Sequence, residues 1–139
     1  MQDFAPLRGP IGVTAGAFDA VTGAQIAATG LEAKQLWMPA FSPDNQLLAY
    51  VDSASKDLRA FDWDGTNKKA TNDRVIVAAG ADASKNVISF PTISPDHQWI
   101  VYQRSSGLGS LGNNADLYAA SVAQPGTEVL LAGPPSSLS

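Results

Sequence analysis

The sequence predicts an all-β fold built from repeated four-stranded units, on three observations. Pro39–Tyr50 and Pro91–Tyr102 lie 52 residues apart and share six of twelve positions, including Ser-Pro-Asp. The 12 glycines and 9 prolines in 139 residues favour turns and short strands over long helices. Short runs such as Asp57–Asp62 alternate apolar and polar residues, which is the period of a half-buried strand.

The composition excludes several classes of function. Hydrophobic residues are 45% of the chain, which is enough for a core, and charged residues are only 16%. The net charge is -4 and the basic residues are scattered, so we expect no nucleic-acid partner and no anionic membrane surface. The chain has no cysteine, which excludes disulfides, thiolate metal sites and cysteine nucleophiles.

We expect neither a signal peptide in the first residues nor a membrane span. Met1–Pro6 lacks the basic and apolar regions of a signal peptide. No apolar run approaches the roughly 18 residues that a spanning helix needs, so we expect no membrane insertion.

Two cycles of strands and turns follow an initial hairpin. The hairpin has strands at Ile11–Asp19 and Gln25–Thr29, joined by a turn at residues 19–23. In the first cycle the expected strands are Trp37–Phe41, Gln46–Asp52, Asp57–Asp62 and Arg74–Ala79, with a surface loop at Thr66–Asp73. In the second cycle the expected strands are Ile88–Ile93, Gln98–Arg104, Asp116–Ser121 and Thr127–Ala132.

The turns of the repeat have a recognisable chemistry. Ser42–Asn45 and Ser94–His97 each place proline, which presets φ, before an aspartate that can bond its own backbone. Pro39 and Pro91 stand at the same place in two expected strands, although proline cannot donate to a ladder. Because the repeat keeps this proline, we interpret it as a built-in feature of the unit.

A unit of about 40 to 50 residues with four short strands is the period of a β-propeller blade. We therefore expect an incomplete β-propeller of four-stranded antiparallel blades. Its expected parts are the outer strands of a partial first blade (residues 1–35), a second blade (36–80), a third blade (88–132) and a disordered tail (133–139). About two and a half blades cannot close a ring, so a fragment of a larger protein or self-association is expected. A small open β-sandwich is the alternative fold.

The repeat resembles the WD40-like PD40 repeat of TolB-type propellers. The resemblance rests on Ser-Pro-Asp, a following strand that ends in an apolar residue and tyrosine, and Asp-Leu at residues 57–58 and 116–117. The family pattern has glycine after Ser-Pro-Asp, whereas Asn45 and His97 stand there in this chain. Asparagine and histidine both tolerate φ > 0, so the turn should survive. The resemblance implies protein or peptide binding and a periplasmic or extracellular location.

The residues that suggest catalysis or metal binding have simpler explanations. His97 is the only histidine, and its counterpart in the repeat is Asn45, so the turn does not need an imidazole. Asp44 and Asp96 occur in both turns, which favours turn capping over a catalytic or calcium role. Asp62–Asn67 resembles the start of a calcium loop but lacks the EF-hand spacing and its final glutamate. We expect no catalytic residue, no cofactor and no metal.

The loop Ser105–Ala115 is where the two cycles differ most, because it holds a seven-residue insertion. Its glycines lack the lysine and the helix of a phosphate-binding loop. Inserted loops often form binding surfaces, so this loop is the best candidate for a specific contact. The candidate contact residues are Gly107, Gly109, Gly112, Asn113 and Asn114.

The three tryptophans could suggest a stacking platform for sugars or bases. Trp99 aligns with Leu47 in the repeat and is expected in the core, and Trp37 is also expected to be buried. Trp63, in an acidic turn, has the best chance of exposure.

These observations favour a non-enzymatic propeller segment that acts as a protein or peptide interaction scaffold. One alternative is the substrate-gating propeller of a prolyl oligopeptidase-like serine peptidase. This chain has no G-x-S-x-G nucleophile elbow and would be inactive alone. Another alternative is a sugar-binding or lyase-type propeller. Further blades, or a protein or peptide, are the expected partners.

Overall fold

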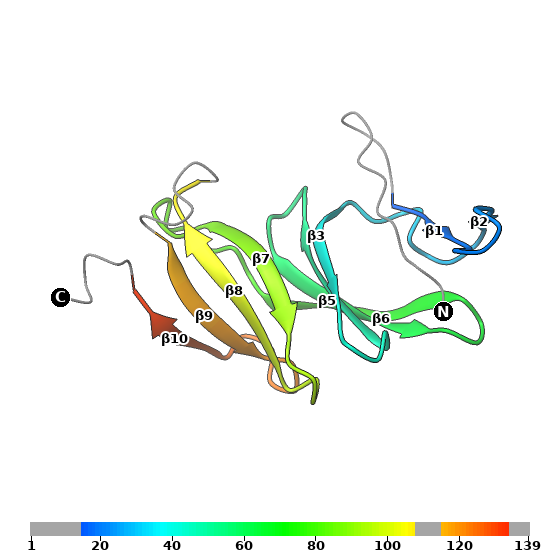
Figure 1. Cartoon of the computed structure of the whole chain (residues 1–139). Helices are drawn as coiled ribbons and strands as arrows, with labels where there is room; N and C mark the ends of the chain where they lie inside the picture. Colours follow the sequence, from blue (N-terminus) through cyan, green and yellow to red (C-terminus); the bar gives the residue numbers. More distant parts are fainter. Residues whose placement is uncertain (1–14, 108–114, 134–139) are drawn as a thin grey trace.

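The computed structural model describes residues 15–107 and 115–133, and every regular element in these ranges is a β-strand. A short hairpin comes first, and two four-stranded sheets follow it along the molecule (Figure 1). The strands are β1 (Ala17–Phe18), β2 (Gln25–Ile26), β3 (Leu36–Phe41), β4 (Leu47–Asp52), β5 (Leu58–Asp64), β6 (Lys69–Val77), β7 (Val87–Ile93), β8 (Trp99–Ser105), β9 (Asp116–Ser121) and β10 (Glu128–Ala132).

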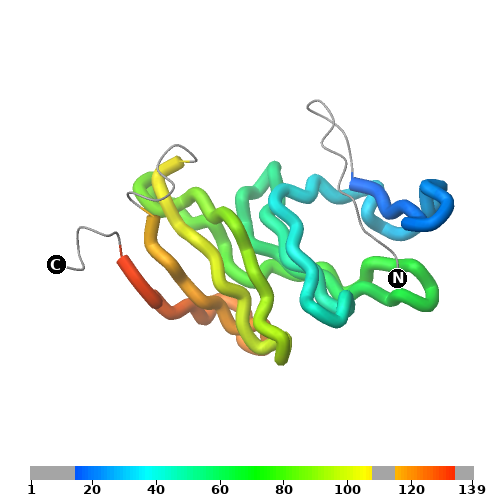
Figure 2. Tube along the Cα trace, viewed as in Figure 1, coloured from blue at the N-terminus to red at the C-terminus, as the bar shows by residue number. Residues whose placement is uncertain are grey.

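Both sheets are simple antiparallel meanders with the same strand order. We call β3–β6 the N-terminal sheet and β7–β10 the C-terminal sheet, and in each sheet every strand pairs with the next one in the chain. The two sheets pack face to face, with β7 against β3 and β4 (Figure 2). The predicted four-stranded antiparallel units are therefore confirmed, and the two cycles of the sequence correspond to the two sheets.

The Ser-Pro-Asp turns have the predicted chemistry. Asn45 and His97 both have a φ of 61°, the left-handed region that the resemblance assigns to glycine. In each turn the amide of this residue donates to the serine carbonyl, at 2.9 Å for Asn45 and 3.0 Å for His97. The aspartate also accepts the serine hydroxyl, at 2.7 Å in Asp44 and 2.6 Å in Asp96. The capping interpretation of these carboxylates is confirmed.

Pro39 and Pro91 lie at β-bulges on edge strands, where a missing donor is tolerated. The register shifts between Trp37 and Ala40 in β3 and between Ser89 and Thr92 in β7. The residue before each proline has a positive φ, 50° in Met38 and 53° in Phe90. These two residues also meet across the sheets, because the Phe90 amide lies 3.3 Å from the Met38 sulfur.

The core consists of two apolar clusters, one on each face of the N-terminal sheet. The cluster between the two sheets includes Leu47, Val51 and Ile76 from the N-terminal sheet, with Ile100 and Tyr102 from the C-terminal sheet. The other cluster packs the N-terminal sheet against the hairpin region. Its buried members are Ala15, Ala17, Leu31, Leu48, Tyr50 and Phe61.

Two expectations about individual segments are wrong. The segment Thr66–Asp73 was expected to be a surface loop, but β6 begins at Lys69 and pairs with β5 as far as Asp64. The polar side chains of this segment predicted a loop, but they are polar because this part of β6 is a solvent-exposed extension of the sheet. Trp99 was expected in the core, but it keeps 38% of its surface exposed because it lies on the face of β8 that turns away from the N-terminal sheet.

The hairpin is shorter than predicted. Its described strands have two residues each, and Asp19 caps the turn through the amides of Val21 and Thr22 at 2.8 and 2.9 Å. Gly23 has a φ of 73°, which explains the glycine of this turn. Residues 11–14 and most of the expected tail lie outside the described residues.

Candidate functional site: a pocket between the two sheets

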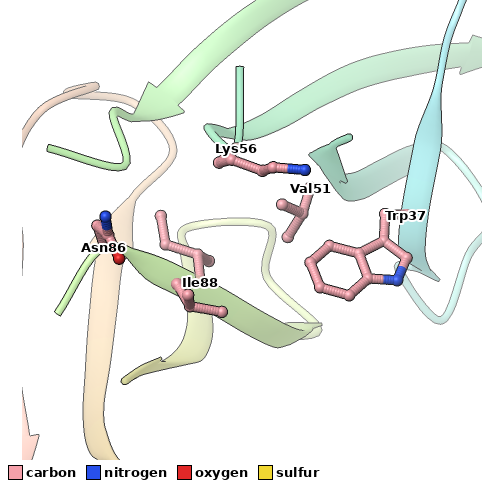
Figure 3. Close-up of a pocket in the computed structure, with 6 residues that line it drawn as sticks. Trp37, Val51, Lys56, Asn86 and Ile88 are labelled. Carbon is pink, nitrogen blue, oxygen red and sulfur yellow. The ribbon is translucent and has the colours of Figure 1, made fainter. Parts of the chain in front are cut away.

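A pocket with a volume of about 310 Å³ opens between the two sheets, at the end of the strands opposite the Ser-Pro-Asp turns. Four segments meet there: the start of β3, the end of β4, the turn after β4 and the start of β7. Figure 3 shows the Trp37 indole on one side and Asn86 on the other. The lining residues are Trp37, Val51, Lys56, Asn86, Val87 and Ile88.

The pocket combines apolar walls with one cation. Val51 and Ile88 are buried, and Trp37 packs against the same apolar cluster, so these walls are held by the core. The Lys56 ammonium lies 5.9 Å from the centroid of the Trp37 ring and donates to the Ser53 carbonyl. A lysine ammonium has three donors, so it can also receive an anionic group. This arrangement suits a ligand with an apolar body and a carboxylate.

The predicted contact loop leaves the C-terminal sheet at this same end. Ser105, its first residue, pairs with Val87, which lines the pocket. Gly107 is described, and its carbonyl accepts the Ser105 hydroxyl at 3.0 Å. The other candidate contact residues, Gly109, Gly112, Asn113 and Asn114, lie outside the described residues. The loop corresponds in the repeat to the turn that carries Lys56.

At the opposite end, the two Ser-Pro-Asp turns are joined. The His97 Nε2 lies 2.8 Å from Oδ1 of Asp44, so the only histidine ties one turn to the other. The hydrogen bond from the Ser42 hydroxyl is the main cause of a lowered Asp44 pKa, and the Gln46 amide and His97 add to it. Ser94 lowers the pKa of Asp96 in the same way. These carboxylates hold the two turns through hydrogen bonds with serine hydroxyls and backbone amides.

The segment that resembles a calcium loop and the tryptophan with the best chance of exposure both have structural roles. Asp64 accepts the backbone amides of Thr66 and Asn67 at 2.9 and 3.0 Å, which is the hairpin-turn interpretation of this segment. Within residues 15–107 and 115–133, no group of three or more histidine, aspartate or glutamate side chains could hold a metal ion. The same ranges contain no helix of the length and apolar character that crossing a bilayer requires. Trp63 is half-buried against the hairpin-side cluster.

Each sheet contains a buried tyrosine that donates to a carboxylate of its outer strand, an arrangement that sequence reasoning missed. In the N-terminal sheet the Tyr50 hydroxyl lies 2.8 Å from Asp73, which also pairs with Lys34 and with Arg59. Burial, then the bond to Asp73, raises the pKa of Tyr50. In the C-terminal sheet Tyr102 donates to Glu128.

Two features of the sequence could have predicted this arrangement. One is the tyrosine that both cycles share, and the other is an acidic residue at the same place in each fourth strand. The cross-strand pairs Ala60–Arg74 and Ala119–Val129 show that the fourth strands correspond at an offset of 55 residues. Asp73 and Glu128 therefore occupy equivalent places. A single offset of 52 or 59 does not align them, so the match could not be found without the strand register.

We expect Asp73→Asn to destabilise the chain at neutral pH and to destabilise it less in acid. Burial would raise the pKa of Asp73, but hydrogen bonds from Lys34 and Tyr50 and the charges of Lys34 and Arg59 outweigh it, so the pKa is lowered. A lowered folded-state pKa contributes stability above the unfolded value of about 3.9, and this stability is lost as the pH falls through the folded pKa. Urea unfolding of both proteins at pH 7 and at about pH 3 measures this. A difference that does not shrink in acid would contradict it.

The fold matches a solved β-propeller structure, whereas the sequence matches no protein-family model and no curated protein. A luciferin-regenerating enzyme superposes on 91% of this chain with a TM-score of 0.57 and 16% sequence identity, over 38% of its own chain. TolB from Acinetobacter baumannii matches 86% of this chain and 38% of its own, with a TM-score of 0.33 and 13% identity. The predicted fold class is confirmed, and the chain spans well under half the length of either protein.

Proposed function

We propose that this propeller-like segment is a non-enzymatic interaction module that binds a peptide or a peptide-like segment of a protein. The observation that carries the proposal is the pocket between the sheets, where the Lys56 ammonium stands over Trp37 beside the buried side chains of Val51 and Ile88. Apolar walls with a few directed polar groups are typical of binding sites.

The chemistry of the pocket indicates which part of a peptide it takes. A volume of about 310 Å³ accommodates one large apolar side chain but no folded partner. A carboxylate next to that side chain would lie within reach of Lys56, and the Asn86 amide faces the pocket from the other side. We therefore propose that the ligand ends in, or carries, a leucine- or phenylalanine-like side chain followed by a carboxylate.

The neighbouring loop supports binding at this end of the sheets. Ser105 pairs with Val87 of the pocket wall, so the inserted loop starts directly beside the pocket. A longer peptide leaving the pocket would pass near Ser105, the described start of this loop. Such a division, with a rigid pocket for one anchor and a loop for the flanking residues, is common in interaction domains.

Lys56→Gln is expected to weaken binding of N-acetyl-Gly-Leu with a free carboxylate about three- to tenfold, because one charge-assisted contact is lost. Binding of the same peptide as its C-terminal amide should not change. The measurement is a nuclear magnetic resonance titration that follows the Trp37 indole N–H in the labelled protein.

Lys69→Gln is the matched control, since Lys69 is an exposed lysine on the far end of β6 that does not line the pocket. It should leave both affinities unchanged. The proposal fails if neither peptide perturbs the Trp37 signal, or if Lys56→Gln and Lys69→Gln weaken binding equally.

A further inference from the structure

The C-terminal sheet has a second face that carries mostly apolar side chains and turns away from the N-terminal sheet. Ile100 and Tyr102 of β8 lie in the cluster between the sheets, so their alternating neighbours Trp99 and Val101 lie on the opposite face. Cross-strand pairing extends this face through Ala119 to β10. Its members are Thr92, Trp99, Val101, Gln103, Leu117, Ala119, Ser121 and Val129, with Leu131 at the bulge of β10. We call it the outer face.

The repeat shows what covers such a face. The positions of the N-terminal sheet that correspond to the outer face are buried by the C-terminal sheet. Leu47 is 3% exposed, whereas its counterpart Trp99 is 38% exposed. Ile76 is 0% exposed, whereas Leu131, which has the same place at the bulge of the fourth strand, is 52% exposed. Both sheets thus present apolar side chains at these two positions, which are buried in the N-terminal sheet and exposed in the C-terminal sheet.

The outer face also lacks charge. None of the described residues that the strand register places on it is charged, although the whole chain has a net charge of -4. Two copies can therefore bring this face together without opposing like charges. Large side chains at Trp99 and Leu117 alternate with small ones at Ala119 and Ser121, so two such faces can interdigitate.

We propose that the outer face is an interface and that its occupant is a second copy of this chain. In the chain itself, the equivalent face of the N-terminal sheet is covered by the opposite face of the C-terminal sheet, which carries Ile100 and Tyr102. The free face that a second copy offers is the outer face, so the contact is two-fold symmetric, with two sheets stacked as in a β-sandwich. The interface lies apart from the peptide pocket, so it does not depend on the proposed binding function.

Sedimentation velocity on the full chain tests the proposal. Raising the concentration from about 10 μM to about 1 mM should convert monomer into dimer. The double variant Val129→Asp/Leu131→Asp should weaken the dimer at least about tenfold, since each chain then buries two charges at the interface. Both side chains are about half exposed on the edge strand, so the monomer should still fold. Val21→Asp, at a residue that is 92% exposed in the hairpin turn, is the control and should dimerise like the parent chain.

A second measurement locates the contact. The chain has no cysteine, so Val129→Cys and Val21→Cys each provide a single position for a nitroxide spin label. Label pairs at residue 129 should report a shorter distance across the dimer than pairs at residue 21, because only the first lies at the interface. A parent chain that stays monomeric at about 1 mM overturns the proposal. A dimer that survives the double aspartate variant, or that brings residues 21 closer than residues 129, also overturns it.

Discussion

Arg104→Met is expected to destabilise the chain by about 3–5 kcal/mol, because it leaves a partly buried carboxylate without its cation. The Arg104 side chain is only 8% exposed, and its Nε and Nη2 donate to Glu128 at 3.0 and 3.2 Å. Methionine keeps much of the volume, so the loss reports charge and hydrogen bonds more than packing.

The same guanidinium also fastens the connection between the two sheets. Its Nη1 donates to the carbonyls of Ala79 and Lys85 at 2.8 and 3.1 Å, and its Nη2 donates to Ala78 at 2.9 Å. These carbonyls belong to the segment that joins β6 to β7. Arg104 therefore anchors this segment to β8 and β10, and its loss should loosen the packing between the sheets as well as the pair with Glu128.

Urea unfolding at neutral pH compares Arg104→Met with Glu128→Gln and with the double variant. The double variant should recover part of the stability, because it removes the uncompensated charge that either single variant leaves. Arg104→Lys should lie between, since one ammonium cannot reach Glu128 and three carbonyls together. If Arg104→Met lost less than about 1 kcal/mol, the anchoring role would be refuted.

The fold could be predicted from the repeat because the residues of the repeat determine the backbone conformation of its turns. Serine, proline and aspartate define a turn by their own hydrogen bonds, and Asn45 and His97 have the positive φ that the comparison with glycine predicts. Strand pairing follows from turns placed at regular spacing, so the order of both sheets could be predicted. Pro39 and Pro91 conflict with strand propensity, but their repetition indicated that the unit accommodates a proline there, and both lie at β-bulges.

Burial was harder to predict, because it depends on what lies across a sheet. Leu47 and Trp99 have the same place in the repeat, but one lies between two sheets and the other does not. Aligning Trp99 with Leu47 therefore predicted burial at a position that is partly exposed. The start of β6 shows the opposite error. Its residues are mostly exposed and polar, so the sequence predicted a loop where the structure has a strand.

The pocket could not be predicted because its walls come from four separate segments. Trp37 and Lys56 are 19 residues apart, and Asn86 is 30 residues further along the chain. Their proximity follows from how β7 packs on β3 and β4, and neither local period nor motif contains this information. The predicted contact loop was chosen from its insertion alone, and its described end does lie beside this pocket.

Ile76→Ala is expected to destabilise the chain by about 2–5 kcal/mol, whereas Leu131→Ala, at the equivalent position, should cost about 0.5 kcal/mol or less. Ile76 is fully buried between the two sheets, so truncation leaves a cavity that the packed C-terminal sheet cannot fill. Leu131 is 52% exposed, so its truncation in the monomer removes few contacts.

The comparison has to be made at about 10 μM, where the proposed dimer is dissociated, and repeated near 1 mM. At the higher concentration Leu131→Ala should become more costly, since the second copy then covers this position, while the cost of Ile76→Ala stays the same. Equal losses for the two variants at low concentration would mean that the outer face is covered within one chain. That result would refute both the equivalence of the two faces and the exposure on which the proposed interface rests.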